Sequence, residues 1–287
     1  MAPLLCGHDI GVHDTLFVTD LDGTLLDATG HVGAYSAAVL ERVAGVGAWV
    51  TCATARSWTT TRRLVGGYFQ LPVVVHNGAA TVRPADGAVQ SAAFLRPTTV
   101  DRVLGACRRA GAPPLVHTLH SGSEQTAWLQ HEASVHVNQY WLDRGADPRS
   151  APQPSWASLP RDHVLGVAVV AERARVQRVQ GVLGEVDGAQ VLVRPDTYRT
   201  GPVWLEVTAA GVSKGGAVRQ LADQLGASRV VVFGDSVNDL PLFAVADESY
   251  AVAGADPQVL ACASGVIGSN EDEAVARWLA RVVLAEV

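Results

Sequence analysis

The stretch LFVTDLDGTL, residues 16–25, decides the fold. It starts with a continuous apolar run, which is typical of a parallel strand buried on both faces of a sheet. Asp20 and Asp22 follow the run, and Gly23 then begins a tight turn in which backbone N–H groups can face an anion. In open α/β sheets, ligands bind outside the carboxyl ends of the strands. The stretch therefore predicts a binding site at the end of a buried strand.

Three more apolar runs end in polar or turn residues in the same way, namely AWVTCAT at 48–54, VVVHN at 73–77 and VVVFGD at 230–235. Apolar residues with helical spacing lie between the strand-like runs at 16–20 and 48–54, after Lys214, and near the C-terminal end. This alternation predicts an α/β fold with a doubly wound, Rossmann-like parallel-sheet core.

The middle of the chain has a different rhythm. A helical pattern, a pair of strand-like runs, a single strand, a second helix and a second strand pair follow one another between residues 96 and 210. Strands of the core type occur on both sides of this segment. We therefore expect an inserted α+β cap domain at 96–210, and a core built from 1–95 and 211–287.

Composition restricts the partners. Of 287 residues, 48% are hydrophobic, 17% are charged, and the net charge is −6, so the chain has no overall attraction for nucleic acid or an anionic membrane surface. No apolar stretch is long enough to cross a membrane. The cysteines are too far apart for a zinc knuckle or a dense disulfide framework: Cys6, Cys52, Cys107 and Cys262. We expect a soluble cytoplasmic protein, a monomer or homodimer.

The polar residues at the strand ends indicate the chemistry. Carboxylates at 20, 22 and 235, without a histidine or cysteine beside them, suit a hard cation with oxygen ligands, and Mg²⁺ is the natural choice. A bound cation lets an anionic nucleophile approach an anionic phosphate, and an aspartate can then form an acyl phosphate. Lys214 is the only lysine among 22 basic residues. Its compact ammonium suits a place among carboxylates and phosphate, where a planar guanidinium is larger.

Four segments, FVTDLDGTL, ATAR, GVSKGG and GDSVNDLPLF, resemble in this order the four motifs of the haloacid dehalogenase superfamily of phosphohydrolases. HNGA at 76–79 and the inserted unit resemble the Cof-type branch with its large cap. The resemblance covers nearly the whole chain; it is specific for mechanism and weak for substrate. It implies a Mg²⁺-dependent phosphatase acting on a small phosphorylated metabolite, such as a sugar phosphate or a nucleotide-like compound. Ala55 departs from the branch, which usually has glycine there, and it could restrict the turn after Thr54.

The resemblance also implies a catalytic role for four residues. Asp20 corresponds to the nucleophile that carries the phosphoryl group, and Asp22 to the general acid and base. Thr54 corresponds to the residue that hydrogen-bonds the phosphoryl group. Lys214 corresponds to the cation that neutralises the phosphate and the nucleophile.

Further residues are expected to hold the metal or the substrate. The implied metal ligands are Asp20, Asp22 (through its backbone carbonyl), Asp235 and Asp239. The expected phosphate or substrate contacts are Gly23, Asn238 and, in the cap, His120 and Ser121 at a strand end. Asp239 could instead cap the following helix, and the cap aromatics and histidines are more typical of a sheet face.

Several alternatives stay open. Asn77 is favoured as a turn residue, and Arg56 can either reach an anion or form a salt bridge. A phosphomutase or phosphotransferase would use the same motifs with a sugar hydroxyl as acceptor. A binding protein that lost turnover would keep the fold. A nicotinamide dehydrogenase is disfavoured because no GxGxxG follows the first strand.

Overall fold

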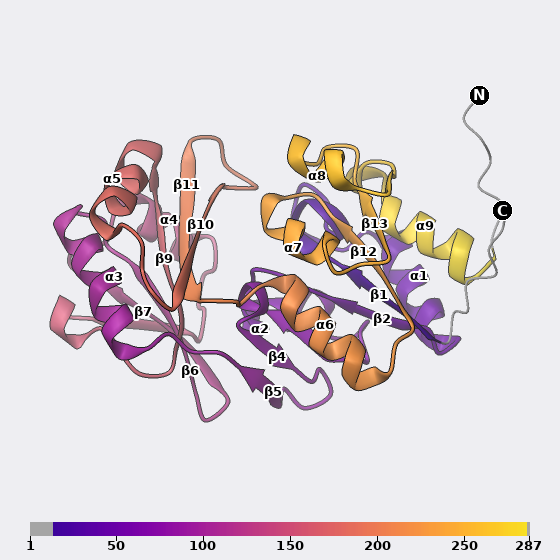
Figure 1. Cartoon of the computed structure of the whole chain (residues 1–287), viewed down its shortest axis with the longest axis horizontal. Coiled ribbons are helices and arrows are strands. Elements are labelled where there is room, and N and C mark those ends of the chain that lie inside the picture. The colour runs from indigo at the N-terminus through magenta and orange to yellow at the C-terminus, as the bar shows by residue number, and fades with distance from the viewer. Residues whose placement is uncertain (1–13, 286–287) are drawn as a thin grey trace.

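A computed structural model describes residues 14–285, and the described chain forms two lobes (Figure 1). Cys6 and the rest of the first thirteen residues lie outside the described part. One lobe contains a parallel sheet with helices on both sides, and the other contains an antiparallel sheet with its own helices. Within the described residues, no helix is both long and apolar enough to cross a membrane.

The parallel sheet has the order β14-β13-β12-β1-β2. Strand β1, which lies between β12 and β2, is buried along its whole length, as the apolar run predicts. The β1–β12 register pairs Thr19 with Phe233, so both strands end at the same edge of the sheet. The strands are β1 (Thr15–Thr19), β2 (Trp49–Cys52), β12 (Arg229–Gly234), β13 (Glu248–Ala251) and β14 (Gly265–Val266).

Alternate residues of β1 pack against different helices, which confirms the doubly wound core. Phe17 belongs to a hydrophobic cluster with α1 (Ala34–Gly45) and α9 (Ala274–Val283). Leu16 belongs to a second cluster, on the other face, with α6 (Lys214–Leu225) and two short helices. The short helices are α7 (Leu240–Phe243) and α8 (Pro257–Cys262). Helix α2 (Trp58–Val65) joins the first cluster.

The third predicted strand differs from the expectation. Val73–Val75 forms β3, but it pairs antiparallel with β4 (Ala80–Val82), which in turn pairs with β5 (Val89–Ala92). Its parallel contact with the core is a single bridge between Ala53 and Val74. Strand β4 pairs with one edge of β3 along its whole length, whereas the segment after β2 turns away from the other edge beyond Ala53, so only one residue pair forms the parallel bridge.

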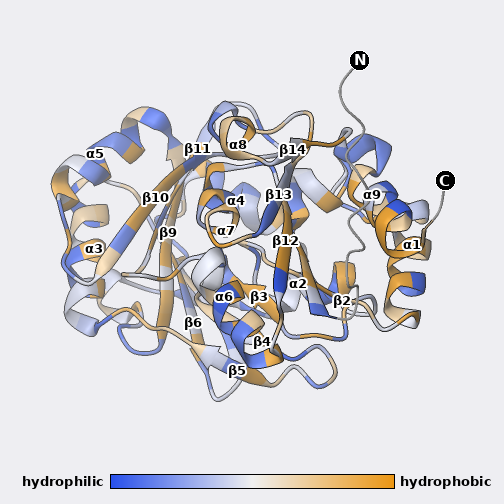
Figure 2. Ribbon diagram, turned by 45° about the vertical axis from the view of Figure 1, so that its right-hand side comes forward, coloured by the Kyte–Doolittle hydropathy of each residue, from blue (hydrophilic) through white to orange (hydrophobic). Residues whose placement is uncertain are grey.

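The second lobe is a six-stranded sheet with the order β10-β11-β9-β6-β7-β8. All neighbours are antiparallel except β7 and β8, which run parallel. Hydrophobic colouring follows β9 here and β12 in the parallel sheet, both of which lie inside their sheets (Figure 2). The strands are β6 (Leu115–His120), β7 (Ser123–Leu129), β8 (Ser150–Gln153), β9 (Val164–Glu172), β10 (Ala189–Pro195) and β11 (Pro202–Ala209).

Helices cover both faces of this sheet. Val167 and Val169 of β9 pack with α3 (Pro97–Arg109) and α5 (Arg173–Leu183), whereas Ala168 packs with α4 (Val135–Leu142) on the other face. Helix α4 and strand β8 lie between the first strand pair and the single strand of the predicted order, where the sequence pattern predicts no element. The lobe lies between β5 and α6 in the chain, as expected for an insertion. The domain boundaries at 96 and 210 stay a prediction.

Candidate active site

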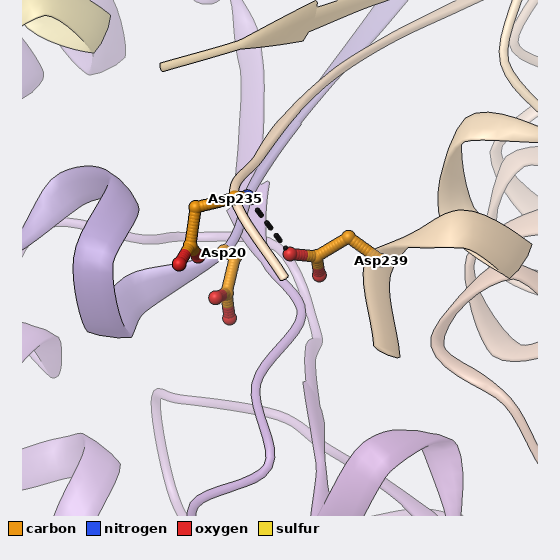
Figure 3. Close-up of side chains that lie close together, drawn as sticks. All are labelled: Asp20, Asp235 and Asp239. Carbon is orange, nitrogen blue, oxygen red and sulfur yellow. Dashed lines mark hydrogen bonds between the residues drawn. The ribbon is translucent and has the colours of Figure 1, made fainter. Parts of the chain in front are cut away.

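Three carboxylates meet at the shared carboxyl edge of β1 and β12. Asp20 follows β1, and its backbone N–H donates to the carbonyl of Phe233 at 2.9 Å. Asp235 follows β12, and Asp239 lies one short 3₁₀ turn later, at Val237–Asp239. One carboxylate oxygen from each residue lies within 4.8 Å of the other two (Figure 3). Parallel strands with matching registers thus bring together acids that are more than 200 positions apart.

Lys214 lies between two of these acids. Its Nζ donates to Asp20 Oδ1 at 2.7 Å and to Asp239 Oδ1 at 2.8 Å, and the residue is only 1% exposed. Ser213 caps helix α6 by accepting the N–H of Gly216, and this fixes the start of the helix. A Cβ on Gly215 would lie 1.9 Å from the carbonyl oxygen of Pro241. The glycine therefore lets the lysine-bearing turn approach the 235–241 segment.

Asp239 holds the loop that carries Asp235. Its Oδ2 accepts the backbone N–H groups of Asp235 and Ser236, both at 3.0 Å (Figure 3). With Oδ1 bonded to Lys214, both oxygens of Asp239 already have partners. The alternative prediction, a cap for the helix that follows, is wrong, because the Asp239 side chain makes no capping hydrogen bond to α7. It binds the preceding turn instead and forms a salt bridge with Lys214.

The charges of this cluster are unbalanced. Burial, together with the neighbouring carboxylates, raises the pKa of Asp20 well above its usual value, although Lys214 opposes the rise. Burial and Asp239 likewise raise the pKa of Asp235. Three carboxylates face one ammonium, so the fully ionised site carries an excess of negative charge. One divalent cation would remove that excess, and the donors are all oxygen atoms, which suits Mg²⁺.

Gly23 brings the turn after β1 against Asp235. Its φ is +81°, and an added Cβ would lie 2.6 Å from Asp235 Oδ2. Thr24 in the same turn donates its hydroxyl to Asp235 Oδ1 at 3.0 Å. The two halves of the cluster are thus joined by a contact that only glycine permits.

Asp22 has partners outside the cluster. Arg56 binds it with two hydrogen bonds, of 2.7 Å from Nε and 2.5 Å from Nη2, so Arg56 forms the salt bridge that the sequence left open. The hydroxyl of Tyr198, from the loop between β10 and β11, also donates to Asp22. Burial would raise the pKa of Asp22, but the bonds and charge of Arg56, with Tyr198, lower it overall.

Two asparagines connect the sheet edge to the cap. Asn77 has φ of +55°, as favoured for a turn residue, and its amide donates to Glu206 Oε2 on β11 at 2.5 Å. Asn238 donates its own amide to Asn77 Oδ1 at 3.0 Å. Asn238 Oδ1 is buried and has no hydrogen-bond partner among the described residues, so it is available to a ligand.

Thr54 lies two residues beyond β2, at the same sheet edge, and is fully buried. Its Oγ1 accepts the backbone N–H of Arg56 at 3.1 Å. Ala55 lies in the turn between Thr54 and Arg56, so the turn forms with alanine in place of the usual glycine.

A cavity of about 180 Å³ extends from Asp22 into the cap. Its lining includes Arg56, Tyr198 and Glu206. His120 and Ser121 are not among the lining residues; they are exposed at the β6–β7 hairpin, where the His120 ring packs against His163. The structure therefore does not bring these two cap residues to the site.

Sequence reasoning missed Tyr198, Glu206 and Glu124. Glu124, on β7, accepts the N–H groups of Trp58 and Thr59 at the start of α2, at 2.8 and 2.7 Å. These residues belong to strands and loops of the cap with no local motif. No pattern in a single sequence distinguishes them from other polar residues.

Comparison with known proteins agrees with this architecture. A family model described as haloacid dehalogenase-like hydrolase matches residues 17–279. An HMP-PP phosphatase of Cronobacter sakazakii is 24% identical over 276 residues, covering 91% of this chain and 92% of that protein. A haloacid dehalogenase-like hydrolase from Bacteroides thetaiotaomicron has a TM-score of 0.78 and 20% identity, covering 93% of this chain and 99% of that one.

A solved structure described as the HAD subclass IIB sugar phosphatase BT4131 has a TM-score of 0.73 and 17% identity, covering 92% of this chain and 97% of that one. At this identity, both structural matches concern the fold alone. The family match covers the parallel-sheet core, the inserted sheet and all the motifs quoted from the sequence. The chain belongs to the haloacid dehalogenase-like hydrolase family.

Proposed function

We propose that this phosphatase removes the phosphoryl group from a small organic phosphomonoester through an aspartyl phosphate formed on Asp20. The observation that carries the proposal is the buried contact of Asp20 with Lys214 at 2.7 Å, beside Asp235 and Asp239. A buried carboxylate held by a single ammonium, next to two more acids, is arranged for a phosphoryl group and a cation.

The fit of the site to Mg²⁺ supports a metal-dependent reaction. Asp20 and Asp235 would hold the ion, and the backbone carbonyl of Asp22 would complete the protein's share of the ligands. Asp239 would support the site through Lys214 and the loop, because both its oxygens already accept hydrogen bonds. When bound, Mg²⁺ supplies positive charge that offsets the phosphate and the acids.

In the first step, a carboxylate oxygen of Asp20 attacks phosphorus as the bond from phosphorus to the leaving oxygen breaks. Asp22, in its protonated form, gives its proton to that leaving oxygen. In the second step, Asp22 takes a proton from water, the water oxygen attacks phosphorus, and Asp20 leaves as a carboxylate. Arg56 and Tyr198 hold Asp22 in the ionised form that the second step needs. We infer that substrate entry loosens these contacts before the first step.

The remaining residues position the phosphoryl group. Lys214 neutralises the charge of the phosphoryl group and of Asp20. The hydroxyl of Thr54 and the backbone N–H of Gly23 donate hydrogen bonds to the phosphoryl group. Asn238 lies at the same edge, with its Nδ2 bonded to Asn77. The cap contributes to substrate binding, because its residues form much of the cavity that opens at Asp22.

The relatives narrow the substrate class. One is named a sugar phosphatase and another an HMP-PP phosphatase. A phosphorylated sugar or a phosphorylated small ring compound fits the limited cavity between the lobes, whereas a phosphoprotein fits poorly. We therefore propose a small phosphorylated metabolite as substrate.

A library of phosphorylated metabolites, scored for phosphate release with Mg²⁺ and with excess EDTA, tests the proposal. We expect release from a few members with Mg²⁺, and none with EDTA. Asp20→Asn should reduce turnover by about a thousandfold or more while the far-UV circular dichroism spectrum stays unchanged, because the change removes the nucleophile's charge but little of its shape. Phosphate moving between sugar positions, with free phosphate constant, would identify a mutase instead.

A further inference from the structure

Beside four acidic residues, the cavity in the cap is lined by five arginines. Four of the five form a salt bridge with a carboxylate. These pairs are Arg56 with Asp22, Arg149 with Asp147, Arg194 with Glu206, and Arg199 with Asp143. The fifth, Arg144, has no carboxylate within salt-bridge distance among the described residues.

Arg144 is held in place by neutral groups. Its guanidinium carbon lies 3.6 Å from the centre of the Tyr140 ring, and Nη1 donates to the Tyr140 carbonyl at 3.1 Å. Its Nε is buried without a hydrogen-bond partner. Burial, together with the charges of Arg149 and Arg56, lowers the pKa of Arg144, although Tyr140 and Asp147 oppose the fall. The protein thus keeps a partly desolvated cation in surroundings that disfavour its charge, and an incoming anion would remove that penalty.

Other groups of the same cavity fit a small polar molecule that extends from Asp22 toward Arg144. The Nε of Arg194 is a second buried donor without a partner. The Trp204 ring lies 5.9 Å from Tyr140 and provides an apolar wall. Burial, with the charge of His76, holds the pKa of His117 well below its usual value, so this lining residue adds a neutral hydrogen-bonding group.

We propose that the leaving group of the substrate carries a second anionic group, a phosphate or a carboxylate, which binds Arg144. This assignment rests on the proposed phosphatase function. Arg144 acts as a specificity-determining residue: it binds the part of the substrate that remains after hydrolysis and does not contact the phosphorus. Asp20 attacks the phosphate at one end of the substrate, where Lys214 neutralises the charge, and Arg144 binds the anionic group at the other end.

Matched substrate pairs test this assignment. Fructose 1,6-bisphosphate against fructose 6-phosphate tests a distal phosphate, and 6-phosphogluconate against glucitol 6-phosphate tests a distal carboxylate. For wild-type enzyme with Mg²⁺ we expect kcat/KM for the member with the second anionic group to exceed that of its partner, in at least one pair, by roughly tenfold to a hundredfold, as for a hydrogen-bonded charge pair. The pair that shows the preference identifies the anion.

Arg144→Gln should remove this preference by lowering kcat/KM for the substrate with the distal phosphate or carboxylate. For the partner that lacks this group, kcat/KM should change by less than about threefold. Arg144→Lys should retain part of the preference, which guards against loss of folding in the glutamine variant. Arg108→Gln is the matched control, because Arg108 is an exposed arginine on α3 that does not line the cavity. It should behave as wild type.

The outcomes separate the two proposals. Hydrolysis of both members of each pair at equal rates, in wild type and in Arg144→Gln, would overturn the role of Arg144 and leave the phosphatase intact. A preference that survives in Arg144→Gln would also overturn it. Failure of wild-type enzyme to release phosphate from any of the four compounds and from the metabolite library would overturn the proposed function itself.

Discussion

At the scale of single residues, the use of lysine at position 214 has a structural reason. All the other basic residues of the chain are arginines, yet this side chain is buried between two carboxylates. An ammonium has three donors that can rotate toward Asp20, Asp239 and a phosphate oxygen. A guanidinium is planar and wider, and its donors have a fixed geometry.

Lys214→Arg should therefore impair catalysis despite the retained charge. We expect kcat/KM with the best library substrate to fall by about a hundredfold or more, comparable to the loss of one donor to a developing anion. Arg219→Lys, on the exposed side of α6, is the control for an exchange of basic residues in the same helix. A wild-type rate in Lys214→Arg would show that the choice of lysine is coincidental.

At the scale of elements, the position of Lys214 depends on a close backbone approach between the turn after β3 and the start of α6. The turn after β3 passes so close to the start of α6 that a Cβ on Gly78 would lie 2.1 Å from the Ser213 carbonyl oxygen. Gly78 also has φ of +97°, which side-chain-bearing residues rarely adopt. The position of Lys214 thus depends on a glycine in another element.

Gly78→Ala should destabilise the protein by about 2–4 kcal/mol, because strain from the backbone angle adds to the overpacking. Gly45→Ala, at the exposed end of α1 with no neighbouring atom within 4 Å of the new Cβ, should leave stability unchanged or raise it by up to about 1 kcal/mol. Urea denaturation of both variants measures the difference. Equal stabilities would mean that the turn moves freely away from α6.

At the scale of the whole molecule, polar contacts join the two lobes in addition to Leu119 and Leu165 of the cap, which pack in the hydrophobic cluster of the core. Glu124 of the cap binds the start of α2 in the core and also accepts a hydrogen bond from His76 at 3.0 Å. Burial would raise the pKa of Glu124, but the hydrogen bonds and charge of His76 and the bonds from Thr59 lower it to about 2. The carboxylate is therefore much better stabilised in the folded protein than in the unfolded chain.

A lowered pKa makes the contribution of Glu124 present above its ordinary pKa of 4.5 and lost as the pH falls toward 2. Compared with Glu124→Gln, wild type should be more stable by about 3 kcal/mol at pH 7 and by about 1 kcal/mol at pH 3. Chemical denaturation at both pH values measures this. Glu41→Gln, at an exposed position on α1, should show no such change, and a pH-independent difference for position 124 would contradict the assignment.

Residues 16–25 and the later motifs determined, by themselves, the family, the doubly wound core and the cluster of Asp20, Lys214, Asp235 and Asp239. The physical reason is local: apolar runs form buried parallel strands, such strands end at one edge of the sheet, and the residue that follows each strand is read directly from the sequence. Ser213 and Gly226 likewise cap α6 through interactions within a few residues.

Only the tertiary structure decided which cap residues meet the core. Tyr198 binds Asp22 across 176 positions, and Glu206 binds Asn77 across 129. These contacts depend on how two separately packed sheets face each other. No periodicity or short motif encodes that arrangement, because each partner is chosen by shape and charge on the opposite lobe.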